Sequence, residues 1–276
     1  MKDIIDFGHG YLIAAWPIFV VLATCVVIEI VSPRVRYGLH ERLPGFLIYM
    51  TVPVTAAMVG IPLQALWQQL QIDPVLDLSG LSPVLVIIYL VLSYDFINYW
   101  EHRFEHRFLW PVHAVHHSVS ELHAANSFNH PLQGGMSFLV HSLHFSLIRL
   151  DSYALPFAAS FLISIWAILI HSPTRVNLGP LWRIIVDSRF HRIHHSIEPR
   201  HFGKNFAPIF SIWDRMFGTA YFPAPDEFPD VGLDGVRPPR SIWSYLVFPL
   251  TVMRAARSSH RTDRAAQLPL GERRSP

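Results

Sequence analysis

The sequence predicts an all-α integral membrane protein, a helical bundle that carries a histidine-rich helical cap. Of its 276 residues, 51% are hydrophobic and only 15% are charged, and the mean hydropathy is +0.30. This composition is typical of chains whose helices lie in a lipid bilayer. The chain also has 17 histidines, and most of them follow the apolar segments at helical spacing. These two observations together favour a membrane-embedded metalloprotein over a soluble domain.

Apolar segments of membrane-spanning length define the expected bundle. Residues 11–31, 46–66 and 83–100 each contain about the 20 apolar residues that cross the hydrocarbon core. A fourth apolar region, residues 136–171, is interrupted near Asp151 and predicts a hairpin that enters and leaves on one side. We therefore expect four to five spans or hairpins.

Charge asymmetry predicts the orientation of these spans. Arg34, Arg36 and Arg42 follow the first apolar segment, whereas Asp73 and Asp77 lie in the next connection. Arginine-rich connections favour the cytoplasm. We expect the N-terminus outside and the histidine sets and the C-terminus in the cytoplasm, so that the active site of this multi-pass protein is cytoplasmic.

The histidines form sets in which residues three or four apart share one helical face. Imidazole in its neutral form is a common ligand of transition metals, and these sets can surround one ion or two. A lone buried histidine is usually only hydrogen-bonded, but that reading does not explain repeated sets. The spacing alone leaves iron and zinc open. The sets are His102 with His106, then His113, His116 and His117, and finally His191, His194 and His195.

Five ordered motifs resemble the fatty acid hydroxylase and sterol desaturase superfamily: DFINYWEHRFEH, LWPVHAVHHS, NHPL, FHRIHHS and KNFAPIFSIWDRMFGT. The resemblance covers residues 95–219. Members of that superfamily are integral-membrane, histidine-ligated di-iron oxygenases. The resemblance implies two iron ions and O₂ as cofactors, a lipid substrate, and hydroxylation or desaturation of a C–H bond. Zinc can occupy such a site in purified protein.

The spacing and the resemblance together nominate ten metal ligands. His171 matches an isolated histidine of the superfamily, and His130 precedes Pro131 as in its histidine–proline motif. Neither belongs to a spaced set. The candidates are His102, His106, His113, His116, His117, His130, His171, His191, His194 and His195.

Several other polar residues have two interpretations. Asp95 precedes His102 on the same helical face, so it can orient a ligand imidazole or face water at a helix end. His141 and His144 lie within an apolar segment and are either functional or hydrogen-bonded between helices. His201 is expected at the surface.

The predicted organisation has three parts. Residues 1–82 form N-terminal transmembrane helices, and residues 83–222 form the di-metal catalytic domain. Residues 223–276 form a proline-rich loop, an interfacial helix near residues 242–253 and a basic tail. The formal charge of +2 predicts no nucleic acid partner.

An external electron donor is expected, either a ferredoxin or a cytochrome with its reductase. The chain has no G-x-G-x-x-G fingerprint for a dinucleotide, and the single cysteine, Cys25, cannot hold an iron–sulfur cluster. A basic surface can receive an acidic donor, although the same side chains can contact anionic lipid. Its residues are Arg189, Arg192, Arg200 and Lys204.

Other functions remain open at this stage. A b-type membrane cytochrome needs histidine pairs in mid-membrane to ligate haem, and a metal-binding transporter needs ligands within the spans. A zincin protease is excluded because its H-E-x-x-H string is absent from the sequence.

Overall fold

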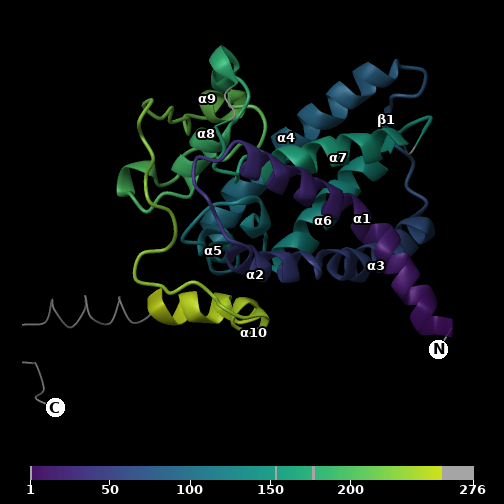
Figure 1. Ribbon diagram of the computed structural model, residues 1–276. Helices are drawn as coiled ribbons and strands as arrows, with labels where there is room; N and C mark the ends of the chain where they lie inside the picture. The colour runs from purple at the N-terminus through teal and green to yellow at the C-terminus, as the bar shows by residue number, and fades with distance from the viewer. Residues whose placement is uncertain (1, 153, 176–177, 257–276) are drawn as a thin grey trace, which may run out of the picture.

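The computed structural model describes residues 2–152, 154–175 and 178–256, and this part of the chain is mostly helical (Figure 1). The long helices lie on one side of the molecule, and the short elements α8 and α9 lie together on the other. The elements are α1 (Lys2–Val31), α2 (Leu39–Tyr49), α3 (Val52–Leu70), β1 (Leu76–Asp77), α4 (Pro83–Phe108), α5 (Trp110–His117), η1 (Ala124–Asn126), α6 (Pro131–Ser146), β2 (Ile148–Arg149), α7 (Ala154–Leu169), η2 (Gly179–Arg183), α8 (Ser188–His194), η3 (Pro199–His201), α9 (Ile212–Met216) and α10 (Ile242–Leu246).

Within the described residues, two helical segments are long and apolar enough to cross a membrane. One is Leu39–Leu70, which combines α2 and α3 over 32 residues, and the other is α4, with 26 residues. The apolar stretches Trp16–Val31 and Ala154–Leu169 are shorter than 18 residues. The expected helical architecture with long apolar helices is therefore confirmed in this coarse form.

The apolar region after residue 136 divides into two helices with different main neighbours. α6 packs chiefly against α3 and also contacts α4, whereas α7 packs against α1 and α4. β2, between α6 and α7, pairs in parallel with β1, and the main-chain N–H of Gly80 donates to Asp151 Oδ2 at 2.7 Å. These contacts join the α3–α4 and α6–α7 connections at the end of the molecule opposite α5 and α8 (Figure 1).

α2 is held against α1 and η1 by a buried polar contact and by close backbone packing. Arg42 of α2 forms an ion pair with Glu29 of α1, and Glu29 Oε1 also accepts from the main-chain N–H of Ala124 at 2.6 Å. Arg42, which the charge asymmetry assigns to a cytoplasmic connection, is only 6% exposed because it pairs with this carboxylate. At Gly45, a Cβ would lie 1.6 Å from Ala125 O, so this contact requires glycine.

A break between α4 and α5 redirects the chain beside the first histidine set. α4 ends at Phe108, Leu109 caps it, and Pro111 stands in the first turn of α5. Proline has no main-chain N–H and cannot continue the helix that precedes it, so a new helix begins here. The break lets α5 fold back beside the last turns of α4. Histidines before and after the break therefore face one another.

α8 begins with a side-chain cap that sets its position. Asp187 Oδ1 accepts from the main-chain N–H groups of Arg189 and Phe190, at 3.0 and 3.1 Å. Such caps satisfy the free donors of the first helical turn. Phe190 is fully buried and packs with Ile170 and Val186, which anchors α8 to the end of α7.

Candidate metal centre

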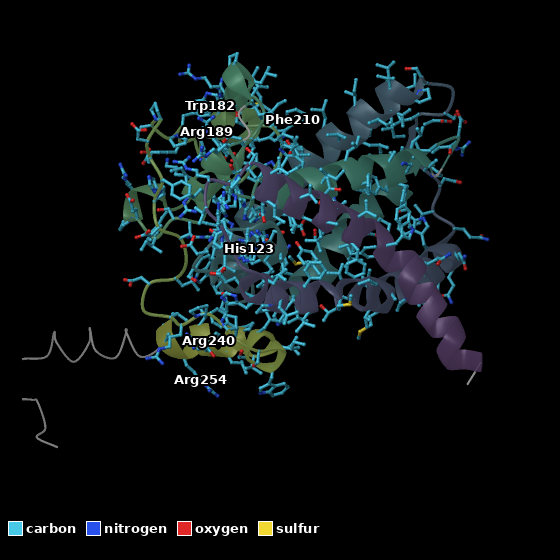
Figure 2. All side chains as sticks on the ribbon, in the orientation of Figure 1. His123, Trp182, Arg189, Phe210, Arg240 and Arg254 are labelled. Carbon is cyan, nitrogen blue, oxygen red and sulfur yellow. The ribbon has the colours of Figure 1, made fainter. Side chains whose placement is uncertain are left out.

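Nine of the ten nominated histidines come together in two buried groups. Within each group, one ring nitrogen of every histidine lies within 4.8 Å of those of the other members. Figure 2 shows side-chain nitrogen atoms concentrated in the part of the molecule that contains α5 and α8, away from β1. We call these the five-histidine group (His102, His106, His113, His117 and His194) and the four-histidine group (His116, His171, His191 and His195).

The Nε2 atoms of the five-histidine group converge. His113 Nε2 lies 3.1 Å from His102 Nε2 and 3.1 Å from His117 Nε2. His106 Nε2 lies 3.2 Å from His194 Nε2. When these nitrogens all carry lone pairs, the lone pairs repel one another at such distances, and a bound cation removes that repulsion. The arrangement therefore fits a metal ion that several imidazoles share.

The four-histidine group has the same geometry. His171 Nε2 lies 3.1 Å from His116 Nε2 and 2.9 Å from His191 Nε2, and His195 Nε2 lies 3.1 Å from His191 Nε2. All four side chains are buried. This group can hold a second ion.

α5 and α8 each contribute histidines to both groups. His113 and His117 belong to the five-histidine group, but His116 between them belongs to the four-histidine group. In α8, His194 belongs to the five-histidine group, whereas His191 and the C-capping residue His195 belong to the four-histidine group. The sequence grouped these histidines by their spacing along each helix. The structure instead interleaves the sets, because adjacent helical positions point about 100° apart.

Main-chain carbonyls orient four of the imidazoles from behind. An Nδ1–H that donates outward leaves the Nε2 lone pair facing inward, which is the arrangement that metal ligation needs. The acceptors lie in segments that surround the groups. The pairs are His102 with Phe206 O at 2.8 Å, His116 with Phe128 O at 3.0 Å, His171 with Ala167 O at 2.7 Å and His194 with Lys204 O at 2.9 Å.

Burial keeps these imidazoles neutral. It lowers the pKa of His116 to about 4, even though its bond to Phe128 O favours the charged form. Burial first, and then the neighbouring histidines, lower the pKa values of His113, His117 and His195 well below the usual range. Neutral imidazole is the form that binds metal, so both groups are ready to ligate at neutral pH.

Asp95 supports the site from a distance. Its carboxylate is fully buried and accepts from the main-chain N–H groups of Ile209 and Phe210, at 2.9 and 3.0 Å, and from Trp213 Nε1–H at 2.7 Å. It contacts none of the nine clustered histidines among the described residues and does not face water. It anchors the segment that follows Phe206, whose carbonyl orients His102.

Asp214 holds the same segment from its other side. Its two carboxylate oxygens accept from the main-chain N–H groups of Phe206 and Ala207, at 2.8 and 2.9 Å, and Thr219 Oγ1 donates at 2.6 Å. Asn205 adopts a positive φ of 59° and donates from Nδ2 to Phe190 O at 2.8 Å. These polar residues close the cap over α8.

His130 lies outside both groups. Its Nε2 is 3.1 Å from Leu246 O, and its Nδ1 accepts from the main-chain N–H of Leu132 at 3.2 Å. It caps α6 and faces α10. Its ligand role remains a prediction without support from the position of its ring.

Other histidines also lie apart from the groups. His201, expected at the surface, is only 1% exposed, because Ser196 Oγ and Glu227 Oε1 lie 2.9 and 3.1 Å from its ring nitrogens. His144 Nε2 lies 3.0 Å from Ser93 Oγ, between two helices.

The sequence interpretation missed two side chains next to the site. Glu105 precedes His106 and Gln133 lies in the first turn of α6, and both are buried beside His113. The only available signal was a glutamate before each histidine of the first set.

Comparison with known proteins relates the region that contains these histidines to a protein family. Residues 87–219 match the fatty acid hydroxylase family, and this range contains all nine clustered histidines. This region belongs to the fatty acid hydroxylase family. No solved structure matches the chain significantly.

Curated relatives of this fatty acid hydroxylase region include alkylglycerol monooxygenase of Danio rerio, which is 36% identical over 131 residues, or 46% of this chain and 29% of that protein. Ornithine lipid hydroxylase OlsE of Rhizobium tropici is 30% identical over 160 residues, or 54% of this chain and 46% of that protein. Delta(7)-sterol 5(6)-desaturase ERG3A of Gibberella zeae is 29% identical over 138 residues, or 48% of this chain and 37% of that protein. The aligned parts therefore span less than half the length of these relatives.

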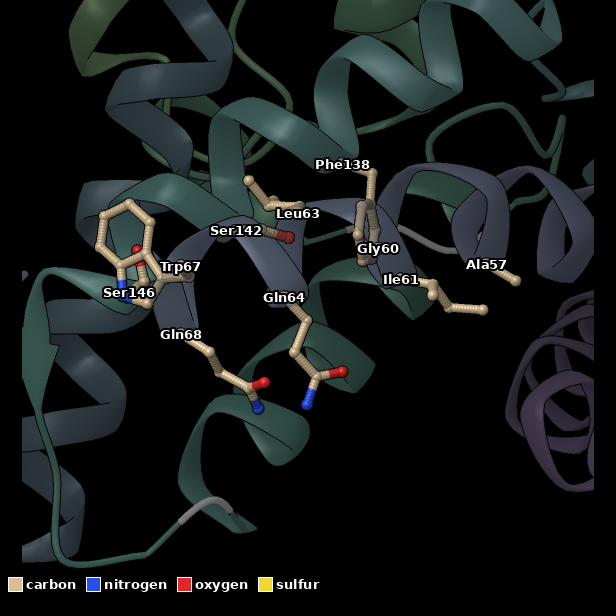
Figure 3. A pocket seen from close by; sticks show the side chains of 10 residues that line it. All are labelled: Ala57, Gly60, Ile61, Leu63, Gln64, Trp67, Gln68, Phe138, Ser142 and Ser146. Carbon is tan, nitrogen blue, oxygen red and sulfur yellow. The ribbon is translucent and has the colours of Figure 1, made fainter. Parts of the chain in front are cut away.

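A separate cavity of about 450 Å³ lies between α3 and α6 (Figure 3). Its lining is mostly apolar and includes Gly60, Ile61, Trp67 and Phe138. None of the clustered histidines lines it. α3 is part of the long apolar segment Leu39–Leu70, and α6 packs against it.

Proposed function

We propose that this protein is a membrane-bound di-iron oxidoreductase that uses O₂ to hydroxylate or desaturate a C–H bond of a lipid. The observation that carries the proposal is the pair of adjacent histidine groups, whose neutral imidazoles converge through Nε2. When bound, two iron ions supply the redox chemistry with O₂. The protein's own residues hold the ions, orient the ligands and exclude water.

Each histidine group is proposed to ligate one of the two ions. We assign the five-histidine group to one ion and the four-histidine group to the other. Backbone acceptors behind His102, His116, His171 and His194 preserve the Nδ1–H tautomer while the ions are bound. The distances of about 3 Å between facing Nε2 atoms leave no room for a porphyrin ring, which argues against a haem protein.

A lipid substrate fits the surroundings of the site. The relatives named above include enzymes named for an alkylglycerol, an ornithine lipid and a sterol, so the substrate class is a lipid rather than one molecule. The first histidine set lies at the end of α4, an apolar helix long enough to span a membrane. A lipid can reach this position from the bilayer without crossing water. The cavity between α3 and α6 offers apolar space for part of such a chain.

The proposed arrangement places the histidine groups on the cytoplasmic side, where an external electron donor reaches them. The orientation rests on Arg34 and Arg36 against Asp73 and Asp77. The donor, a ferredoxin or a cytochrome with its reductase, is proposed because the sequence has no site of its own for a flavin, a nicotinamide or an iron–sulfur cluster.

The test is a combined metal and product measurement on protein purified in detergent. We expect two iron ions per chain and formation of an oxidised lipid that depends on O₂ and on a ferredoxin or cytochrome system. Candidate lipids are an alkylglycerol, an ornithine lipid and a sterol. A protein that binds two ions but oxidises none of a broad lipid extract would contradict the enzymatic proposal and favour metal transport.

A further inference from the structure

His113 differs from the other oriented histidines in what lies behind its ring. Four imidazoles of the site donate from Nδ1 to main-chain carbonyls. His113 Nδ1 instead lies 3.1 Å from Glu105 Oε2. Both side chains are buried, with exposed fractions of 1% for His113 and 3% for Glu105. A carboxylate buried in this position needs partners, because burial of an unpaired charged group is strongly unfavourable.

The contact selects one tautomer of His113. Its Nε2 faces His102 and His117 inside the five-histidine group, so ligation needs the proton on Nδ1. A proton on Nδ1 needs an acceptor, and Glu105 Oε2 provides one. Carboxylate acceptors behind a ligand histidine fix its tautomer and increase the electron density at the ligating nitrogen.

Gln133 orients the carboxylate. Its Nε2 donates to Glu105 Oε2 at 2.8 Å and also lies 2.9 Å from His113 Nδ1. An amide nitrogen donates and cannot accept the Nδ1 proton. In the ligating tautomer, the proton of His113 therefore goes to Glu105, and Gln133 stabilises the same carboxylate oxygen from α6.

We propose that Glu105 is a positioning residue of the metal centre, which holds His113 in its ligating tautomer and strengthens its bond to the ion of the five-histidine group. The inference rests on the proposed di-metal function and adds a residue that acts through His113 without touching the ion. A side-chain substitution does not remove the four main-chain carbonyls. Glu105, in contrast, is a side chain whose substitution can change how strongly a ligand histidine binds the metal.

α4 supplies a matched control one helical turn away. Glu101 is also a buried glutamate on α4, with an exposed fraction of 9%. Its Oε2 lies 3.3 Å from His141 Nε2 and 3.2 Å from Ser137 Oγ, and neither partner belongs to a histidine group. A change at Glu101 therefore disturbs the same helix and removes the same type of group without touching a candidate ligand.

The experiment measures metal binding by the full-length protein in detergent. Wild type, Glu105→Leu, Glu105→Gln and Glu101→Leu are stripped of metal and titrated anaerobically with Fe²⁺, and in parallel with Co²⁺, whose absorption spectrum reports the ligand field. We expect Glu105→Leu to weaken one of the two binding steps by about 10–100-fold and to change the Co²⁺ spectrum. Glu105→Gln keeps an acceptor oxygen, so it should recover most of the affinity with a smaller spectral change. Glu101→Leu should match wild type in both readouts.

The outcomes separate this inference from the function on which it rests. If wild type binds two ions and both Glu105 variants bind them with unchanged affinity and spectrum, Glu105 does not position His113. An equal loss in Glu101→Leu would assign the effect to helix packing and would also overturn the inference. Failure of wild type to bind metal would refute the di-metal function itself. If Glu105→Leu does not fold, the spectrum of Glu105→Gln decides the question, since an unchanged spectrum would count against the proposal.

Discussion

His117 of α5 stacks on His195, the C-capping residue of α8, with ring centroids 4.4 Å apart, although the two residues belong to different histidine groups. The groups are therefore neighbours that share a wall of imidazole rings. A displacement of α5 or α8 changes both groups together, because each helix contributes to each group. This coupling shapes the expected effects of substitutions in the site.

Removal of one clustered histidine should abolish catalysis without preventing membrane insertion. We expect His116→Ala and His194→Ala each to lower lipid oxidation more than about 100-fold, because each change removes a candidate ligand from a shared centre. Product analysis together with membrane fractionation measures both effects. His40→Ala, an exposed residue outside both groups, serves as the control and should keep full activity. Near-normal turnover in His116→Ala would remove this histidine from the ligand set.

Asp95 should be required for stability rather than for ligation. Asp95→Ala leaves three donors without their acceptor, namely the buried Ile209 N and the partly buried Phe210 N and Trp213 Nε1. An unsatisfied buried donor costs about 1–3 kcal/mol and a partly buried one costs less, so a loss of at least about 2 kcal/mol is expected. Thermal unfolding in detergent measures it. Asp77→Ala, at an exposed position, should leave the unfolding temperature unchanged, and a similar change in both variants would contradict this account.

Acidification should destabilise the metal-free protein. Burial lowers the pKa of His116 from 6.5 to about 4, so the unfolded chain takes up a proton at a higher pH than the folded chain does. Stability is then fully present above pH 6.5 and is lost as the pH falls from about 6.5 towards about 4. The other buried histidines shift in the same direction. Unfolding temperatures of metal-free protein across this range test the sign, and a flat profile would show that the imidazoles are not buried as described.

Alanine substitutions at two glycines should affect the stability of the protein differently. Gly45→Ala places a Cβ 1.6 Å from the main-chain oxygen of Ala125, a contact that only backbone movement can relieve. We expect a loss of stability of about 1–3 kcal/mol. Gly134→Ala, in α6 with no atom within 4 Å of the added Cβ, should be neutral or stabilise the protein by up to about 1 kcal/mol. Equal unfolding temperatures for the two variants would show that α2 does not pack on η1 in this way.

The topology prediction can be tested with reporters at the chain ends. With the arginines after the first apolar segment inside the cell, the N-terminus should lie outside and the C-terminus in the cytoplasm. A reporter fused after Pro276 that is active only in the cytoplasm should therefore give signal. Activity of an outside-only reporter at that end would reverse the proposed orientation of the histidine groups.

The sequence by itself indicated the class of this protein. Apolar runs of span length indicated a helical membrane architecture, because backbone polar groups in lipid must be satisfied within helices. Repeated histidines at helical spacing indicated a metal centre, and the ordered motifs pointed to the fatty acid hydroxylase family, which the comparison of residues 87–219 bears out. These properties depend on local composition and spacing, so the residues alone carry them.

Only the tertiary structure decided how the histidines are shared. His116 and His117 are neighbours in the sequence but face different groups, because the break at Pro111 and the approach of α8 fix which side of α5 each group occupies. The contact between Glu105 and His113 could not be predicted from the sequence either. Glu105 and Gln133 approach His113 only because α4, α5 and α6 converge. Helical spacing specifies the face on which a side chain lies, but the packing of distant helices determines which partner it meets there.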